Sequence, residues 1–486
     1  MKVVSRIGCS AHSGNGLCLG GASEGHQCAQ SRSDLSWRLP FQRPRSAFRR
    51  RLTSIPTWRG GTGPSTAAGR PPAAPPTNHC GFGRSCFGKT APPNLIMSVD
   101  ILALPRSLHQ RARQRILELA SWSNGDILIQ STHTHNGPAV VDTLHPFMCY
   151  GLSDLSMVET YSQHLENDLV DAASEALNAS QTAVTLDYKV TTASIAYNRV
   201  GLPYLENTVP RHRARKPNGN AAAVIFNYAC HPVAAGMRTL FDGDFPAGGA
   251  CNYIENTNPE CFALFLQGAA GDQNPMGVPS WELRDEYATR LGAAVDVAMQ
   301  TPGRSIGSPL QTSYQEVQIP LDITPTAGNL AAVRAAYASR LPNLDGNPAW
   351  YGRHAQVMIG RIDSGSYETS VVCPFQVWKF GGSPQLRIGI VGGELVSGYA
   401  AYFRARFGGA NGVIVGGYGN ESCYYVPSAQ FLPPYSSGGS YEGGWDPDHP
   451  GIAGGSMTVY GHIGHFRGGT TGVEATVINT LNSMFA

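Results

Sequence analysis

Charged residues are scarce in this sequence, at 14% of its 486 residues, and it has no hydrophobic run of the roughly 18 residues that cross a bilayer. The segment from Met1 to Gly20 also lacks the apolar stretch of a secretory signal. None of the 11 cysteines lies in a CxxC pair, which argues against a zinc ribbon or a thioredoxin-type motif. Cys251 and Cys261 form either a local disulfide or two buried thiols. With 57 Gly, 34 Pro and 42% hydrophobic residues, the composition favours a loop-rich globular protein with no transmembrane segment.

Positive charge is concentrated at the start of the chain. Residues 1–92 contain 13 Lys or Arg but only Glu24 and Asp34, a balance of +11, which leaves −9 for the remainder. This Ser-, Gly-, Pro- and Arg-rich leader has no apolar periodicity, so we expect it to be irregular, and either disordered or the product of a misassigned gene start. An organelle transit peptide is the alternative, because such peptides are also Arg-rich and poor in acids. The charge is not spread over a folded surface, so no nucleic-acid partner is predicted.

Alternating apolar runs and amphipathic segments begin near residue 94. An apolar run at 94–102, a helical pattern at 108–120 and a second apolar run at 126–132 predict a βαβ unit. Further strands are expected at 222–230, 261–267, 385–393 and 412–417, helices near 155–177, 281–298 and 394–407, and antiparallel strands at 305–325 and 367–380. The sequence therefore predicts an α/β fold, a mixed sheet with flanking helices, in a single domain over residues 93–486.

Polar residues directly follow four of the predicted strands. His133 and His135 follow the strand at 126–132, His231 the strand at 222–230, Asp272 the strand at 261–267, and Glu394 the strand at 385–393. Ligands of open α/β sheets bind beside the carboxyl ends of strands. We therefore expect these side chains to meet in one crevice.

Two histidines and a glutamate at strand ends match the ligand set of a catalytic zinc, which takes three protein ligands and keeps one position for water. Such an ion lowers the pKa of its water to about 7 and polarises a carbonyl, which suits amide hydrolysis. On an extended strand His133 and His135 point to opposite faces, so only one is expected to bind metal unless the chain bends there. Each feature also has a simpler explanation: a single strand-end histidine is usually structural, and the Gly-rich run 268–275 is a tight turn.

Six separated motifs occur in an order similar to that of neutral ceramidases. They are HTHNGP at 133–138, NYACHP at 227–232, FLQGAAGDQNP at 265–275, Gly-Glu at 393–394, YYVPS at 424–428 and YEGG at 441–444. From about residue 93 the chain resembles the N-terminal catalytic domain of the neutral/alkaline non-lysosomal ceramidase family. The resemblance implies a single zinc-hydrolase catalytic domain with one Zn2+ per chain, which cuts the amide bond of N-acylsphingosine (ceramide) with zinc-activated water.

The resemblance also implies a role for each matching residue. The implied metal ligands are His133, His231, Glu394 and, more weakly, Tyr425. His135 is implied to hydrogen-bond the substrate oxygen. Arg199 and Tyr441 are implied to lie beside the negative charge that develops on that oxygen, where hydrogen-bond donors lower the barrier.

The chain departs from the family pattern at three places. Asn274 stands where ceramidases carry a serine, and an amide cannot lose a proton to act as a nucleophile, so Asn274 is implied as a hydrogen-bond donor to substrate. No C-terminal immunoglobulin-like domain is expected. The family's first strand precedes the segment that matches 94–102, where this chain has its leader, so an edge of the sheet is expected to be missing.

Three hypotheses for the function follow, because Asn274 reshapes the pocket. The first is a zinc amidase for ceramide or a related N-acyl lipid, with peripheral contact to a membrane surface and a secreted or cell-envelope location, as the resemblance implies. The second is a zinc amidase or esterase for a soluble acyl compound, and the third is a non-catalytic scaffold. An amidohydrolase barrel is disfavoured because it needs eight βα units and further strand-end histidines.

Overall fold

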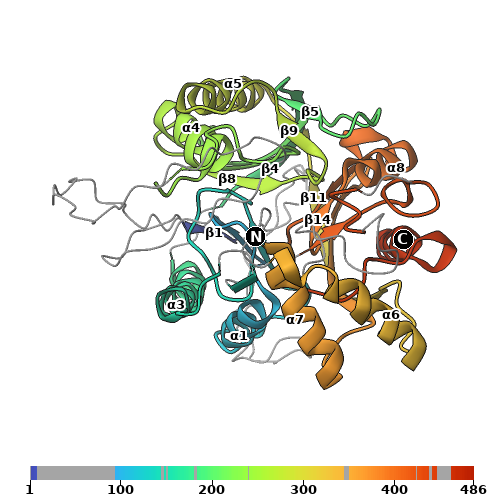
Figure 1. Cartoon of the computed structure of the whole chain (residues 1–486). Coiled ribbons are helices and arrows are strands. Elements are labelled where there is room, and N and C mark those ends of the chain that lie inside the picture. The colour runs from blue at the N-terminus through green and yellow to red at the C-terminus, as the bar shows by residue number, and fades with distance from the viewer. Residues whose placement is uncertain are drawn as a thin grey trace, which may run out of the picture.

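The computed structural model describes residues 2–7, 94–143, 147–148, 151–179, 183–238, 240–343, 350–422, 424–436, 440–445 and 461–486. Within these ranges the strands form three main open sheets, and helices cover their outer faces (Figure 1). The predicted mixed α/β class is confirmed. The strands nevertheless divide among three sheets rather than one, because an apolar run specifies that a strand is buried but not which strand it pairs with.

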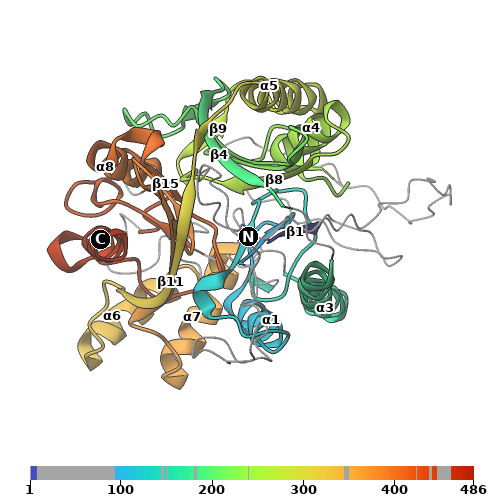
Figure 2. The same cartoon turned by 180° about the vertical axis from the view of Figure 1, so that it is seen from behind.

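The first sheet has three parallel strands in the order β1 (Lys2–Ile7), β2 (Leu95–Val99) and β3 (Ile127–Ser131). Helix α1 (Arg106–Leu117) connects β2 to β3, which confirms the predicted βαβ unit, and it packs beside α3 (Ser156–Asn178) (Figures 1 and 2). Strand β1 occupies the edge that was expected to be missing, and it lies inside the leader that was expected to be irregular. Residues 8–93 lie outside the described residues, so the boundary near residue 92 stays a prediction.

The second sheet has five strands in the order β10 (Arg304–Ser305), β4 (Thr185–Thr192), β6 (Thr208–Arg215), β7 (Ala221–Tyr228) and β8 (Phe262–Gln267). Strands β7 and β8 are parallel and the other pairs are antiparallel. Helices α4 (Cys251–Thr257) and α5 (Trp281–Gln300) lie together over this sheet (Figure 1). Cys251 and Cys261 are buried thiols that are not bonded to each other.

The third sheet has four strands in the order β11 (Gly307–Pro320), β12 (Ser370–Gly381), β13 (Leu386–Val391) and β15 (Val413–Gly416). Strands β11 and β12 are antiparallel, as the sequence predicted, while β13 and β15 are parallel. Four helices accompany this part of the chain: α6 (Ala327–Ala338), α7 (Trp350–Ser364), α8 (Ser397–Phe407) and α9 (Val473–Phe485).

A shared hydrophobic core joins the three sheets. Its buried residues come from all of them and include Ile96, Leu128, Ile225, Leu264, Ile388 and Ile414. Because the sheets meet at this core, the carboxyl ends of β3, β7, β8 and β13 approach one another. None of the helices in the described part of the chain is long and apolar enough to cross a membrane.

Two short ribbons complete the framework around these strand ends. Strand β5 (Ala196–Asn198) pairs with β9 (Gln273–Pro275), and β14 (Glu394–Leu395) pairs with β16 (Tyr425–Val426). Each ribbon joins segments that are far apart in the sequence. Between them, they hold four of the eight predicted site residues, Arg199, Asn274, Glu394 and Tyr425, on or directly beside regular backbone.

Candidate metal and active site

The two histidines of the HTHNGP segment leave β3 on a bent backbone. The amides of Thr132 and His133 donate to the carbonyls of Val99 (2.9 Å) and Ile101 (3.1 Å), which continues the pairing beyond the end of β3. His133 has a φ of 67°, in the left-handed region that non-glycine residues seldom adopt. The bend brings the Nε2 atoms of His133 and His135 to 3.3 Å. The chain is therefore the exception to the expectation of opposite faces, which assumed an extended strand.

Backbone carbonyls determine the tautomers of the two more buried histidines of this cluster. Nδ1 of His133 lies 2.7 Å from the carbonyl of Leu102, and Nδ1 of His231 lies 2.8 Å from that of Ala270. A carbonyl can only accept a hydrogen bond, so each Nδ1 carries the proton. Each Nε2 is left with a lone pair, which is the form that binds a metal ion.

Glu394 lies between these two imidazoles. Its Oε2 is 3.1 Å from Nε2 of His133 and 3.2 Å from Nε2 of His231. Tyr425, its partner in the β14–β16 ribbon, places its hydroxyl 3.3 Å from Nε2 of His231. Ligand atoms about 2.0–2.2 Å from a tetrahedral zinc lie roughly 3.3–3.5 Å from one another, so these separations fit one shared ion to within a few tenths of an ångström.

The third histidine joins the same group. Ligand atoms of His133, His135 and His231 all lie within 4.8 Å of one another, and the group is largely buried. These three histidines thus have the geometry to hold a metal ion. Glu394 and Tyr425 contact the same imidazoles, so five potential ligands converge here.

Burial sets the charge state of this cluster. It lowers the pKa of His231 to about 4 and, together with the neighbouring imidazoles of His133 and His231, lowers the pKa of His135 well below its usual value. Burial alone would raise the pKa of Glu394, but contact with His133 and His231 holds that pKa well below its ordinary range. At neutral pH the cluster therefore combines the neutral imidazoles of His135 and His231 with the ionised carboxylate of Glu394, the state in which these groups bind metals.

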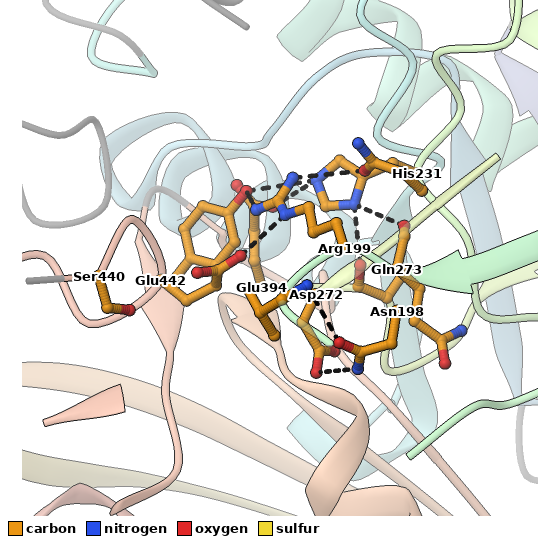
Figure 3. A network of polar contacts seen from close by, with 12 residues as sticks. Asn198, Arg199, His231, Asp272, Gln273, Glu394, Ser440 and Glu442 are labelled. Atoms are coloured by element: carbon orange, nitrogen blue, oxygen red, sulfur yellow. Dashed lines mark hydrogen bonds and ion pairs between the residues drawn. The ribbon is translucent and has the colours of Figure 1, made fainter. Parts of the chain in front are cut away.

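Arg199 forms the other half of the site (Figure 3). Its Nε donates to Glu442 (2.8 Å), one terminal nitrogen to Oδ1 of Asn274 (3.3 Å), and the other to the hydroxyl of Tyr425 (3.1 Å). Its guanidinium carbon also lies 5.2 Å from the centre of the Tyr441 ring. Burial would lower the pKa of Arg199, but Tyr425 and Glu442 raise it well above its usual value, so the guanidinium stays charged.

The structure thus brings all eight predicted site residues into one cluster of side chains in contact. They are His133, His135, Arg199, His231, Asn274, Glu394, Tyr425 and Tyr441. None of them lies apart from the others.

The sequence predicted that Asp272 lies in this crevice, but the supporting role that it has there was missed. Its buried carboxylate accepts from the Asn198 amide (2.8 Å) and from both the amide (2.7 Å) and hydroxyl (2.8 Å) of Ser397. Its carbonyl accepts from the amide of Arg199 (2.9 Å), so Asp272 holds the turn that presents Arg199 (Figure 3). The available signal was its place after an apolar strand, in the Gly-Asp segment that follows β8.

Glu442 was also missed, although it adjoins Tyr441 in the YEGG motif. It is 1% exposed, and it accepts a hydrogen bond from Arg199, on a segment 243 residues away. Its pKa is raised by burial and lowered by Arg199, with a net upward shift. The pairing depends on the tertiary fold, so no local pattern announces it.

The Gly-rich run after β8 serves close backbone packing. The amide of Gly271 donates to the carbonyl of Leu395 (2.9 Å), and a Cβ at Gly271 would lie only 2.9 Å from the carbonyl oxygen of Glu394. Glycine is required for this approach. The run therefore holds the backbone of Glu394 against the second sheet, beyond the tight turn that the sequence alone suggested.

No family model and no curated protein matches this sequence. Among solved structures, the fold is similar to that of neutral ceramidase from Pseudomonas aeruginosa, with a TM-score of 0.50 and 16% identity over 68% of this chain and 60% of the other. A ceramidase complexed with C2 is similar with a TM-score of 0.50 and 14% identity, over 74% of this chain and 63% of the other. This chain thus spans about three fifths of the length of the structures it matches. The described part of the chain has a neutral-ceramidase-like α/β fold.

Proposed function

We propose that this protein is a zinc-dependent hydrolase that cuts the amide bond of an N-acylated lipid such as ceramide. The observation that carries the proposal is the position of Glu394 Oε2, at 3.1 and 3.2 Å from the Nε2 atoms of His133 and His231. Both Nε2 atoms have lone pairs, because each Nδ1 donates to a backbone carbonyl. The fold likeness to neutral ceramidases supports the same activity.

We assign one zinc ion to His133, His231 and Glu394, with Tyr425 as a fourth and weaker ligand. Glu394 is preferred to His135 because its Oε2 lies 3.1 and 3.2 Å from the other two imidazoles, whereas the less buried His135 has its Nε2 3.3 Å from His133 and its ring centre 5.7 Å from that of His231. When bound, zinc supplies Lewis acidity and lowers the pKa of a water molecule to about 7.

The remaining residues would bind and polarise the substrate. Arg199 keeps its charge, and with the phenol of Tyr441 it lies where donors can stabilise negative charge on the substrate oxygen. His135 is neutral and less buried than His133, which suits a hydrogen bond to the same oxygen. Asn274 accepts from Arg199 through Oδ1, so its Nδ2 is left as a donor toward substrate and not as a nucleophile.

An apolar rim beside Asn274 supports a lipid-like substrate. Tyr197 lies opposite Asn274 in the β5–β9 ribbon, and the amide of Met276 donates to the carbonyl of Ile195. Gly236, which precedes Met237, lies close to Pro279, since a Cβ on this glycine would be 3.1 Å from the Pro279 side chain. The rim consists of Tyr197, Val200, Leu205, Met237, Met276 and Val278, which are 37% to 84% exposed. Neighbouring exposed apolar side chains of this kind are typical of surfaces that bind apolar ligands. We propose that they seat the acyl and sphingoid chains and lie against a membrane surface.

Asn274 favours a second candidate function, the hydrolysis of a soluble acyl amide or ester. Because its Oδ1 faces Arg199, Asn274 presents a different shape and its Nδ2 donor to the substrate, whereas the serine hydroxyl of ceramidases both donates and accepts through one atom. This candidate uses the same metal and the same oxyanion donors. It differs in leaving the apolar rim without a role.

The test combines metal analysis with a substrate panel. The purified full chain is expected to bind one zinc ion and to hydrolyse ceramide in detergent micelles faster than a short N-acyl amide or an acyl ester. His231→Ala should lose both metal and activity, while Tyr337→Phe, which removes a buried hydrogen bond to the carbonyl of Ile463, should keep both. Preference for the short substrates would favour the second candidate. Zinc without any turnover would leave only a scaffold, and absence of zinc would overturn the metal assignment.

A further inference from the structure

Tyr418, directly after β15, has no role in the proposed chemistry, yet it is 1% exposed beside the metal-binding residues. Its φ is 62°, in the left-handed region. Backbone conformations of this kind persist only where the surrounding structure imposes them, and they are common at functional sites. The contacts of Tyr418 with two neighbouring segments impose its left-handed backbone conformation.

The backbone of Tyr418 connects the two segments that carry metal-binding side chains. Its amide donates to the carbonyl of Gly393 (2.7 Å), the residue before Glu394. Its carbonyl accepts from the amide of Ser131 (3.1 Å), two residues before His133. The β13–β14 turn and the end of β3 belong to different sheets, and Tyr418 bridges them.

The side chain of Tyr418 makes the same connection. Its hydroxyl donates to Oε2 of Glu394 (3.4 Å), the oxygen that also faces both imidazoles. Its ring lies 4.6 Å from the ring of His133, centre to centre.

We propose that Tyr418 is a positioning residue that holds the Glu394 carboxylate and the His133 ring in the arrangement that binds metal. The inference rests on the proposed function, because it takes Glu394 as a zinc ligand. A carboxylate oxygen has two lone pairs, so Oε2 can bind metal with one and accept from the phenol with the other. Hydrogen bonds to ligating side chains orient them, and their loss typically costs 10–100-fold in metal affinity or activity.

Contacts from α1 hold the Tyr418 loop independently of the phenol. The amide of Asn420 donates to the carbonyl of Ile129 (2.5 Å), and its side-chain oxygen accepts from Arg113 (2.6 Å). Glu421 accepts from Arg106 (2.7 Å). The loop should therefore keep its place when the hydroxyl of Tyr418 alone is removed.

The test is the zinc affinity of Tyr418→Phe, measured by competition with a chromogenic chelator on the full chain. The variant is expected to bind zinc about 10–100-fold more weakly than wild type while its urea-unfolding midpoint without metal stays near the wild-type value. Tyr337→Phe is the matched control, because it also loses one buried phenol hydrogen bond, at 2.8 Å to Ile463. Its zinc affinity should not change. In a Glu394→Ala background, Tyr418→Phe should have no further effect.

Two results would separate the inference from the proposed function. Zinc binding by wild type with an equal Kd for Tyr418→Phe would overturn the positioning role, whereas absence of zinc binding by wild type would overturn the proposed function itself. Should Tyr418→Phe not fold, Asn420→Gly is the second variant, since glycine keeps the left-handed backbone at φ 65° and releases the loop from Arg113. It is expected to weaken zinc binding to a smaller extent, and an unchanged Kd there would also overturn the role.

Discussion

The two halves of the candidate site are held by different kinds of contact. In the metal-binding half, backbone carbonyls orient His133 and His231, and β-pairing places Glu394 opposite Tyr425. In the guanidinium half, Arg199 is oriented by side chains, chiefly the carboxylate of Glu442. A backbone carbonyl is present whatever the sequence, whereas one substitution can remove a carboxylate. Metal affinity should therefore be robust to substitutions in the guanidinium half, and transition-state stabilisation should be sensitive to them.

The strongest disruption of the metal-binding half is expected from Glu394→Gln. Loss of the anionic oxygen between two imidazoles should abolish stoichiometric zinc and lower kcat/KM by about 10³-fold, which corresponds to about 4 kcal/mol. Zinc content by mass spectrometry and turnover of the preferred substrate provide the measurement. Glu368→Gln, at a carboxylate that is 55% exposed, serves as the control and should behave as wild type. A variant that keeps its zinc would remove Glu394 from the ligand set.

Glu442→Gln is expected to impair the guanidinium half of the site and to leave the metal-binding half intact. The variant leaves Arg199 without its anionic partner, so kcat/KM should fall by about 10²-fold, while the zinc Kd stays at the wild-type value. Isothermal titration with zinc and steady-state kinetics on the same preparation test both statements. Equal losses in zinc affinity and activity would show that the halves are not independent.

A smaller change is expected from Asn274→Ser, which alters what the pocket offers to substrate. One hydrogen bond is worth about 1 kcal/mol, so kcat/KM should change by about tenfold or less. The hydroxyl can accept as well as donate, so the rate on ceramide relative to a short N-acyl amide should rise. The ratio of the two kcat/KM values measures this directly. A ratio equal to that of wild type would mean that residue 274 does not determine specificity.

The smallest effect on activity is expected at His212, which lies apart from both halves, beside Tyr188 and Phe380. Burial lowers its pKa to about 3, against about 6.5 in the unfolded chain. Between these values only the unfolded state takes up the proton, so the stability is present above about pH 6.5 and is lost as pH falls toward 3, by at most about 1.4 kcal/mol per pH unit. His212→Leu should show a shallower pH dependence in urea unfolding, with unchanged activity at pH 7. An unaltered slope would contradict the buried neutral state.

Apolar patterning predicted the strands that position the site. The runs before His133, His231 and Glu394 became β3, β7 and β13, because continuous apolar segments of that length are buried in α/β folds. Strand β6 was not predicted, since its Arg211 and Arg213 suggest a surface. Both are buried because they pair with Asp187 on the neighbouring strand, which no local pattern reveals.

His133, His231 and Glu394 could be predicted as candidate ligands because each directly follows an apolar strand, whereas Tyr425 was implied only by the resemblance to ceramidases. The orientation of the side chains in the site could not be predicted, because it depends on tertiary contacts and on unusual backbone angles. The left-handed φ values of His133 (67°) and Tyr418 (62°) are examples, since nothing in either residue type demands such an angle. Glu442 shows the same limit, because its partner Arg199 is contributed by a distant segment.

The close approach at Gly271 carries a consequence for how such proteins can diverge. A single methyl group there would lie 2.9 Å from the carbonyl oxygen of Glu394, so only glycine allows the loop after β8 to pack this closely against the backbone of Glu394. Exposed rim residues such as Val278 can change in size and polarity without altering the distance between this loop and the backbone of Glu394. Substrate preference can thus change over evolutionary time, while main-chain contacts keep the distances between the metal-binding residues constant.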